Sequence, residues 1–175
     1  MMIRMPVKSE VLTQPFLDFL AEQFQLDPLG IHGIEHWLRV LITGRKIAQR
    51  ISANLKVIEL FALVHDSRRW NAMNDPLHGQ RAAEFCENLN NRWFKAQEYD
   101  LRLLRTACRY HSSGNLHPNL TVQACWDADR LDLGRVGKHP KKTYLGSRLA
   151  RDENFMKMAY ERSVTRFVIE DFNYE

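Results

Sequence analysis

The feature that most constrains this chain is an apolar helical run that ends in an adjacent histidine and carboxylate, His65 and Asp66. The apolar residues that precede the pair have the i, i+3, i+4, i+7 spacing of a buried helical face, namely Val57, Leu60, Phe61 and Val64. The pair continues this inward face, so an imidazole and a carboxylate are carried toward the core. Burying both is costly without a partner, and a metal ion satisfies both. The run therefore predicts a core helix that ends at a metal-ligating centre.

Helical spacing recurs along the whole chain, and no segment shows the strict alternation of a strand. We therefore expect an all-α fold. At 175 residues, with 45% hydrophobic and 26% charged residues, the chain suits a single domain, 1–175, with a sizeable core. The expected helices cover about 9–25, 36–52, 56–66, 78–89, 94–109, 119–133 and 143–168, and the last has a break near 151–152. Pro15 suits the first turn of a helix, so the first helix could instead start near Thr13.

The sequence also bears on compartment and redox state. No apolar run approaches the roughly 18 residues of a membrane span, and the first residues lack the long apolar segment of a secretion signal. The three cysteines, Cys86, Cys108 and Cys125, form no Cys-x-x-Cys motif and sit in helical patterns. We expect them to be reduced core thiols. The expected location is cytoplasmic, with no membrane partner.

The charge distribution favours anionic partners only mildly. The formal net charge is +4, with an isoelectric point near 9.1, but Lys and Arg are spread along the chain. A nucleic-acid surface usually shows basic clustering together with a recognisable motif, so a nucleic acid is not the expected partner. A small anionic substrate fits this distribution, and so does a basic solvated surface without a partner.

Other histidines and carboxylates in helical contexts accompany the central pair. They are His36, His78, His111 and Asp129. Taken singly, each histidine has a structural explanation: His78 could cap a helix, His111 could favour a helix C-terminus, and His36 could be a satisfied core group. Taken together with the central pair, they suit Mn, Fe, Co, Ni or Zn. Six ligands exceed one tetrahedral site and fit two adjacent ions, with Asp66 as the natural bridge.

These motifs resemble those of the HD-domain superfamily of metal-dependent phosphohydrolases, which is named for the His-Asp pair. His36-x-x-Arg39-Val40 resembles the superfamily's first motif, and the stretch from Asp127 to Asp132 its last. The resemblance covers about 31–137, the expected metal-site core, which the C-terminal helices at 143–168 follow. The additional His78 and His111 resemble the subgroup that holds two metals, which includes the bacterial diadenosine tetraphosphate hydrolases.

The resemblance implies a helical bundle of the HD type with one or two divalent transition metal ions as cofactors. By this resemblance, the ligands of one ion would be His36, His65, Asp66 and Asp129, and those of the other would be His78, His111 and the bridging Asp66. Asp129 is preferred to Asp127 because the family's ligand directly precedes the basic or apolar residue of the closing helix. Asp127 could instead orient a ligand histidine.

The implied reaction is hydrolysis of a phosphoester or phosphoanhydride bond in a nucleotide-like small molecule, by attack of a metal-activated water. Asp66 would be catalytic through the metals, and arginines would hold the phosphate oxygens. The candidate arginines are Arg39, Arg68, Arg69 and Arg130, with Lys138, Lys141 and Lys142 at the rim. Arg68 and Arg69 stand where family members often place Gly and Lys, so one of them would replace the family's phosphate-binding lysine.

Two other functions fit the same motifs. The superfamily also includes mixed-valent di-iron oxygenases with a similar ligand set. A degenerate domain, in contrast, would only bind a nucleotide or a partner protein. The completeness of the ligand set argues against degeneracy, because a decayed site would be expected to lose ligands. The metal, the substrate and the oligomeric state are left open by the sequence.

Overall fold

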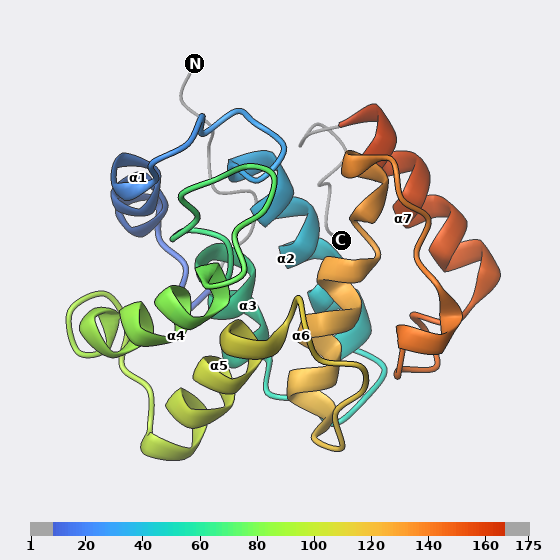
Figure 1. Ribbon diagram of the computed structural model, residues 1–175. Coiled ribbons are helices and arrows are strands. Elements are labelled where there is room, and N and C mark those ends of the chain that lie inside the picture. Colours follow the sequence, from blue (N-terminus) through green and yellow to red (C-terminus); the bar gives the residue numbers. More distant parts are fainter. Residues whose placement is uncertain (1–8, 167–175) are drawn as a thin grey trace.

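The computed structural model describes residues 9–166, and every regular element in this range is helical (Figure 1). The α-helices are α1 Gln14–Gln23, α2 Ile34–Ala48, α3 Leu55–Val64, α4 His78–Leu89, α5 Glu98–Tyr110, α6 Leu120–Arg130 and α7 Glu153–Thr165. Two 3₁₀ helices, η1 Leu133–Val136 and η2 Lys142–Tyr144, lie between α6 and α7. Among these residues the only β pairing is an isolated bridge between Asn90 and Phe94. The all-α prediction is confirmed.

Side-chain caps set where several helices begin. The hydroxyl of Thr13 accepts a hydrogen bond from the amide of Phe16, and Pro15 lies in the first turn, so α1 begins at Gln14, close to the start that Pro15 predicts and not near Ser9. The same kind of cap begins α3, α6 and α7, with Asn54, Asn119 and Asp152 as the capping residues. Short polar residues just before the apolar pattern therefore determine where these helices begin.

Several helices are shorter than their apolar pattern predicts. α2 ends at Ala48, α5 begins at Glu98, and α6 ends at Arg130 before η1. The expected helices at 143–168 reduce to η2 and α7, and residues 167–168 lie outside the described range. Loop residues such as Phe94 and Leu145 are also buried against the core, so apolar spacing continues past the helix ends.

α3 forms the centre of the molecule. Every residue from Val57 to Val64 is buried, as expected of a helix that neighbours surround on all sides. α2, α5 and α6 pack against it (Figure 1). Its one buried carboxylate, Glu59, accepts hydrogen bonds from Arg45 and from the hydroxyl of Ser9. The C-terminal end of α3 is therefore held firmly inside the fold, which fixes the positions of His65 and Asp66.

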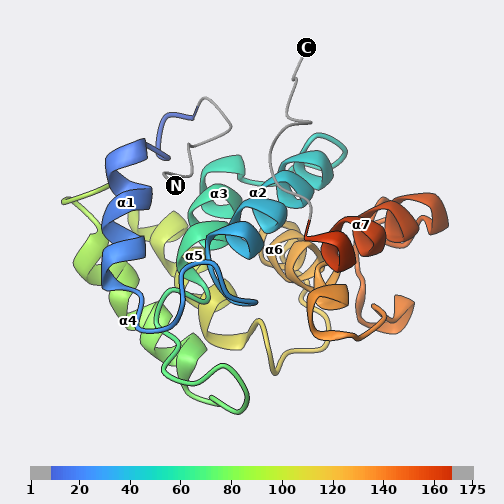
Figure 2. The same ribbon diagram turned by 90° about the horizontal axis from the view of Figure 1, so that it is seen from above.

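The remaining helices surround this centre in an ordered way. α4 packs on α5, α2 packs on α6, and α7 packs on η1. α1 and α7 lie on opposite sides of the molecule in both views (Figures 1 and 2). One continuous hydrophobic core draws residues from α1 through α7. No helix in the described part of the chain has the length and apolarity needed to cross a membrane.

Candidate metal centre

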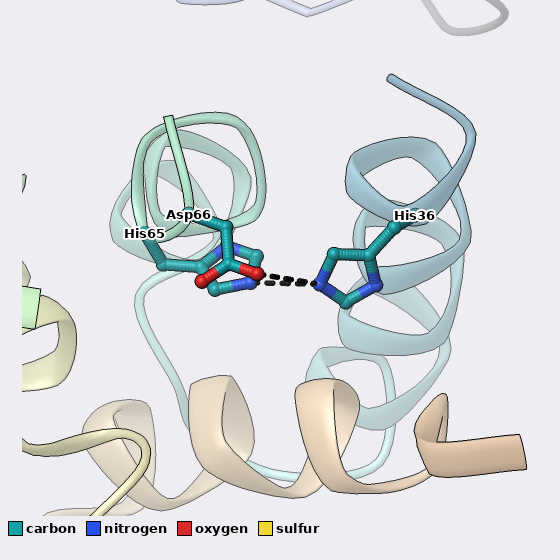
Figure 3. Close-up of side chains that lie close together, drawn as sticks. All are labelled: His36, His65 and Asp66. Atoms are coloured by element: carbon teal, nitrogen blue, oxygen red, sulfur yellow. Dashed lines mark hydrogen bonds and ion pairs between the residues drawn. The ribbon is translucent and has the colours of Figure 1, made fainter. Parts of the chain in front are cut away.

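Five helix ends meet at one place, and each brings a ligand candidate from the sequence. α2 and α4 contribute residues near their N-termini, whereas α3, α5 and α6 contribute residues at or beside their C-termini. Figure 3 shows His36 on α2 facing His65 and Asp66 at the end of α3. All six side chains are buried: His36, His65, Asp66, His78, His111 and Asp129. The fold thus brings together every metal-ligand candidate.

The first half of this cluster joins α2, α3 and α6. The Nε2 atoms of His36 and His65 face each other at 3.0 Å. Oδ1 of Asp129 lies 3.4 Å from Nε2 of His36 and 3.6 Å from Nε2 of His65. Oδ2 of Asp66 lies 3.6 Å from Nε2 of His36. Two imidazoles and two carboxylates therefore converge on one point.

The second half joins α4 and α5 to the same aspartate. The Nε2 atoms of His78 and His111 lie 2.9 Å apart. Oδ1 of Asp66 lies 3.3 Å from Nε2 of His78 and 3.5 Å from Nε2 of His111. Asp66 thus directs one carboxylate oxygen toward each histidine pair. The ligand atoms of His36, His65 and Asp66, and those of Asp66, His78 and His111, are close enough for each set to hold a metal ion.

Hydrogen bonds at Nδ1 fix how the four imidazoles present themselves. Each Nδ1 donates to an oxygen: a side-chain carboxylate for His36 and a backbone carbonyl for the others. The acceptors are Asp132 for His36, Phe61 for His65, Asp75 for His78 and Cys108 for His111. A neutral imidazole that donates from Nδ1 carries a lone pair on Nε2. In each histidine pair, the lone pairs of the two Nε2 atoms therefore point at each other. A cation or a proton must stabilise this arrangement.

Asp129 supplies a second sign that the cluster suits a cation. Its Oδ1 atom is buried and accepts no hydrogen bond from any residue in the range 9–166. A buried carboxylate oxygen without a partner is costly. It faces the lone pairs of His36 and His65, so only a positive charge satisfies all three atoms. Imidazole nitrogen with carboxylate oxygen is a donor set that suits a divalent transition ion, and the residues present fit such an ion.

The pKa values of the cluster agree with this chemistry. Burial, reinforced by Arg135, lowers the pKa of His36 to about 3, and burial together with His111 lowers the pKa of His78 to about 4. Burial opposes ionisation of Asp66, but the surrounding imidazoles, His65 first, hold its pKa well below the usual range. Burial also opposes a charge on His111, yet the Asp66 carboxylate raises the pKa of His111. The pKa of His111 is thus shifted in the opposite direction to that of its neighbour His78.

A cavity of about 650 Å³ opens onto the cluster. Of the predicted phosphate-binding residues, Arg69, Arg130 and Lys138 line it. Nη1 of Arg69 lies 3.4 Å from Oδ1 of Asp66 and donates to Nε2 of His78 at 3.3 Å. Lys141 does not line the cavity, and Lys142 pairs with Glu153 on the surface. Arg69 is therefore the predicted arginine that reaches the ligand atoms.

The other predicted arginines are engaged elsewhere. Arg39 donates from Nε and Nη2 to both carboxylate oxygens of Asp132, at 2.7 and 3.0 Å. Arg68 stacks over the ring of Phe85, 4.5 Å from its centroid, and does not line the cavity. Arg130 donates to three backbone carbonyls, those of Gly114, Asn115 and Tyr144. Its guanidinium thus ties the segments around the cavity wall together.

The three aspartates of the closing motif, Asp127, Asp129 and Asp132, have distinct positions. Asp129 lies in the ligand cluster, whereas Asp127 accepts hydrogen bonds from Nε2 of Gln123 and from the amides of Gly146 and Ser147. Asp127 thus anchors the segment after η2. The role of orienting a ligand histidine falls to Asp132, whose Oδ2 accepts from Nδ1 of His36 at 2.7 Å.

Sequence reasoning missed His32 and Arg135. Nδ1 of His32 lies 2.8 Å from Oδ2 of Asp66, and Nε2 lies 3.0 Å from the carbonyl oxygen of Ala72, both within hydrogen-bonding distance. Arg135 extends Nη2 to within 3.7 Å of Oδ1 of Asp129. The one sequence signal for His32 was its place one turn before His36.

Comparison with known proteins agrees with this geometry. No protein-family model matches the chain, and a search of curated proteins finds no significant match. A solved structure of a predicted HD superfamily hydrolase from an uncultured Thermotogales bacterium is similar to this chain. The two share 25% sequence identity, the match covers 87% of each chain, and the TM-score is 0.63. The fold is thus an all-helical domain of the HD type, and the neighbour together with the His/Asp cluster supports a metal-dependent hydrolase.

Proposed function

We propose that this protein is a metal-dependent phosphohydrolase that cleaves a phosphoester or phosphoanhydride bond in a nucleotide-like small molecule. The observation that carries the proposal is the set of opposed Nε2 lone pairs with a carboxylate between them. Bound divalent ions would supply the Lewis acidity that ionises a water molecule near neutral pH and offsets negative charge on phosphoryl oxygens. Every ligand that such chemistry requires comes from this one chain.

The proposal includes two ions, as in the subgroup that contains the diadenosine tetraphosphate hydrolases. The support is that Asp66 directs Oδ2 toward His36 and Oδ1 toward His78 and His111. One carboxylate that serves two histidine pairs is the arrangement expected of a bridging ligand. Asp129 lies against His36 and His65 of the first set, and its ligand atom is also within 4.8 Å of that of His111.

Three basic side chains are placed to bind the substrate. Arg69, Arg135 and Lys138 line the cavity beside the ligand cluster. Nε and Nη1 of Arg135 donate to the backbone carbonyls of Ile31 and Asp132, which leaves Nη2 directed at the carboxylates. An anchored guanidinium binds phosphoryl oxygens with little loss of side-chain entropy. We assign phosphate binding to these three residues, with Arg39 and Arg130 acting indirectly through Asp132 and the cavity wall.

The cavity also suits an organic substituent on the phosphate. Its volume of about 650 Å³ falls within the range of small-molecule sites. Ile31, Met73, Leu133 and Val136 give part of its lining an apolar character. A nucleotide combines an anionic group with a partly apolar base, which fits this division of the cavity.

The test is metal analysis combined with phosphate release from a panel of nucleotides, comparing the wild type with Asp66→Ala. We expect the variant to lose both bound metal and turnover. Arg92→Ala serves as the matched control, because Arg92 is exposed and outside the cavity, and it should retain both. Full metal content and unchanged turnover in Asp66→Ala would refute the proposal.

The same assay separates hydrolysis from oxygenase chemistry. A hydrolase works with a redox-inert ion such as Zn²⁺ or with Mn²⁺ under anaerobic conditions. An oxygenase needs a redox-active iron pair and consumes oxygen. Phosphate release without oxygen supports the proposal, whereas oxygen consumption without phosphate release would replace it.

A further inference from the structure

A second cavity lies far from the metal centre, between the C-terminal end of α2 and the segment that leads into α7. Its volume is about 770 Å³, and its lining includes Arg50, Arg148 and Arg151 together with Ile51 and Leu149. No residue lines both this cavity and the cavity at the metal centre. His36 lies in the first turn of α2, and Arg50 follows its C-terminal end; a helix of 15 residues at 1.5 Å per residue is about 22 Å long.

The three arginines of this cavity have no carboxylate partner in the described part of the chain. Among residues 9–166, none of Arg50, Arg148 and Arg151 makes an ion pair or a side-chain hydrogen bond. Lys142, in contrast, pairs with Glu153. Asp152 is the one acidic residue of the lining, and its carboxylate already caps α7 through the amide of Phe155. The cavity is thus strongly electropositive.

The backbone places Arg148 and Arg151 on the same side of one helical turn. A single helical turn runs from Ser147 to Arg151, closed by the bond from the amide of Arg151 to the carbonyl of Ser147 at 3.2 Å. Arg148 and Arg151 are three residues apart on this turn, so their side chains are neighbours. Ser147 also caps the turn, because its hydroxyl accepts from the amide of Ala150 at 3.3 Å.

The turn itself is fixed to the core. The carboxylate of the fully buried Asp127 accepts from the amides of Gly146 and Ser147, at 2.9 and 2.7 Å. Gly146 lies so close to Gln123 that an added Cβ would come within 2.5 Å of its side chain. The cavity is therefore preformed, and a ligand would not have to order this segment on binding.

The basic character extends along α2. Lys46 lies one turn before Arg50, and Arg162 of α7 is near enough that it, after burial, lowers the pKa of Lys46. Like charges that lie this close favour binding of a counter-anion. Nearby, the partly buried Ile51 and Leu149 contribute an apolar portion to the lining.

We propose that this cavity is a second ligand site, which binds a small anion that carries two or more phosphate groups. Three guanidinium groups around one concavity, none of them paired with another of the described residues, match several phosphate oxygens. A concave site of this size fits a small molecule better than an extended nucleic acid strand. The site is independent of the phosphohydrolase proposal, since it shares no lining residue with the metal centre.

The test is a titration of tripolyphosphate into the metal-free full-length protein, followed by backbone amide NMR. We expect shifts concentrated at residues 50–51 and 146–152. The double variant Arg148→Gln, Arg151→Gln should weaken this binding about tenfold or more, because each charged hydrogen bond contributes substantially. The control is Arg92→Gln, Arg102→Gln, which removes the same charge from exposed positions outside the cavity and should change the affinity less than about twofold.

Three results would overturn this proposal. The first is equal weakening in both double variants, which would indicate nonspecific attraction to a basic surface. The second is shifts confined to the lining of the metal-centre cavity. The third is a single-stranded oligonucleotide that binds more tightly than tripolyphosphate and shifts residues well beyond the cavity. Thermal unfolding of both variants, expected to match the wild type, ensures that lost binding is not lost folding.

Discussion

Asp132 fixes the orientation of His36, one member of the first histidine pair, through a hydrogen bond. Its carboxylate accepts from Nδ1 of His36 and from two nitrogens of Arg39, all within 3.0 Å. Because that carboxylate fixes the imidazole tautomer, Nε2 of His36 must present its lone pair to the cluster. The remaining nitrogen of Arg39, Nη1, is buried without a partner among the described residues. Among residues 9–166, Asp132 is therefore the one carboxylate that pairs with the buried guanidinium of Arg39.

Replacing Asp132 with asparagine tests this role. The variant Asp132→Asn keeps the side-chain shape but leaves the buried Arg39 charge unpaired, which is expected to cost about 3–5 kcal/mol of unfolding free energy. Loss of the fixed tautomer should also reduce metal affinity about 10- to 100-fold. Urea unfolding and calorimetric metal titration measure the two effects. The control is Glu161→Gln, at an exposed pair with Lys157, which should change stability by less than about 1 kcal/mol.

Metal affinity should depend on pH through His111. The Asp66 carboxylate raises the pKa of His111, and a proton and a metal compete for the same Nε2 atom. Below this raised pKa, affinity at the site formed with His78 should fall about tenfold per pH unit, and it should level off above it. His36 and His78 add no such dependence above pH 5, because burial lowers their pKa values to about 3 and about 4.

Calorimetric titration with Mn²⁺ between pH 5.5 and 8.5 measures this dependence. Binding at the lower pH values should also release about one proton per ion at this site. In His111→Ala the protein should bind one equivalent fewer, and the steep pH dependence should disappear with it. An affinity that stays constant across this range would contradict the assignment of the proton to His111.

At the scale of elements, α4 and α5 approach each other unusually closely at Gly79. A Cβ added there would come within 2.5 Å of the carbonyl oxygen of Cys108 and 2.9 Å of that of Arg109. These atoms belong to the backbone of α5, which cannot turn aside as a side chain can. Gly79 follows His78, and Cys108 accepts the hydrogen bond of His111. The absence of a side chain at residue 79 therefore sets the distance between the two histidines.

The variant Gly79→Ala should force the two helices apart. We expect a loss of about 1–3 kcal/mol in unfolding free energy and a weakened second metal equivalent, while the set around His36 keeps its ion. Urea unfolding and metal counting by mass spectrometry report the two quantities. Gln80→Ala is the matched control, because Gln80 is exposed on the same helix, and it should retain both metals. Equal metal content in the two variants would show that helix spacing does not govern the pair.

Helix patterns explain which parts of the site could be predicted. His65 and Asp66 continue a regular buried face, so spacing alone places them inward. His32 lies in a loop before α2, and Arg135 lies in the 3₁₀ helix η1, where a period of 3.6 residues carries no information. Arg39 is on the predicted face, but spacing cannot say which carboxylate it meets. Loop geometry and partner choice arise from tertiary packing, which one sequence does not specify.

At the scale of the whole molecule, the ligand set draws on five helices that are far apart in the sequence. Residues from 36 to 129 must be brought together before the cluster exists. A ligand that binds only the native state stabilises it by mass action, by about 2.7 kcal/mol at a concentration 100 times its dissociation constant. Bound metal should therefore raise the unfolding free energy by linking the five helices.

Thermal unfolding with and without metal tests this coupling. Adding Mn²⁺ or Zn²⁺ to chelator-treated protein should raise the melting temperature by several degrees, since 1 kcal/mol corresponds to about 2–4 °C for a chain of this size. Asp66→Ala, which lacks the proposed bridge, should show little or no rise. Identical melting curves for the wild type in chelator and in metal would mean that the cluster does not bind these ions.

The order of the ligands along the chain has a consequence for biosynthesis. His36 is made early, whereas Asp129 lies near the C-terminal end of α6. A nascent chain that stops before α6 holds four histidines and Asp66 but lacks the carboxylate that completes the first set. The set of Asp66, His78 and His111 is complete before α6 is made, whereas the set around His36 gains its second carboxylate only when α6 has emerged from the ribosome. The second set can therefore form earlier during translation than the first.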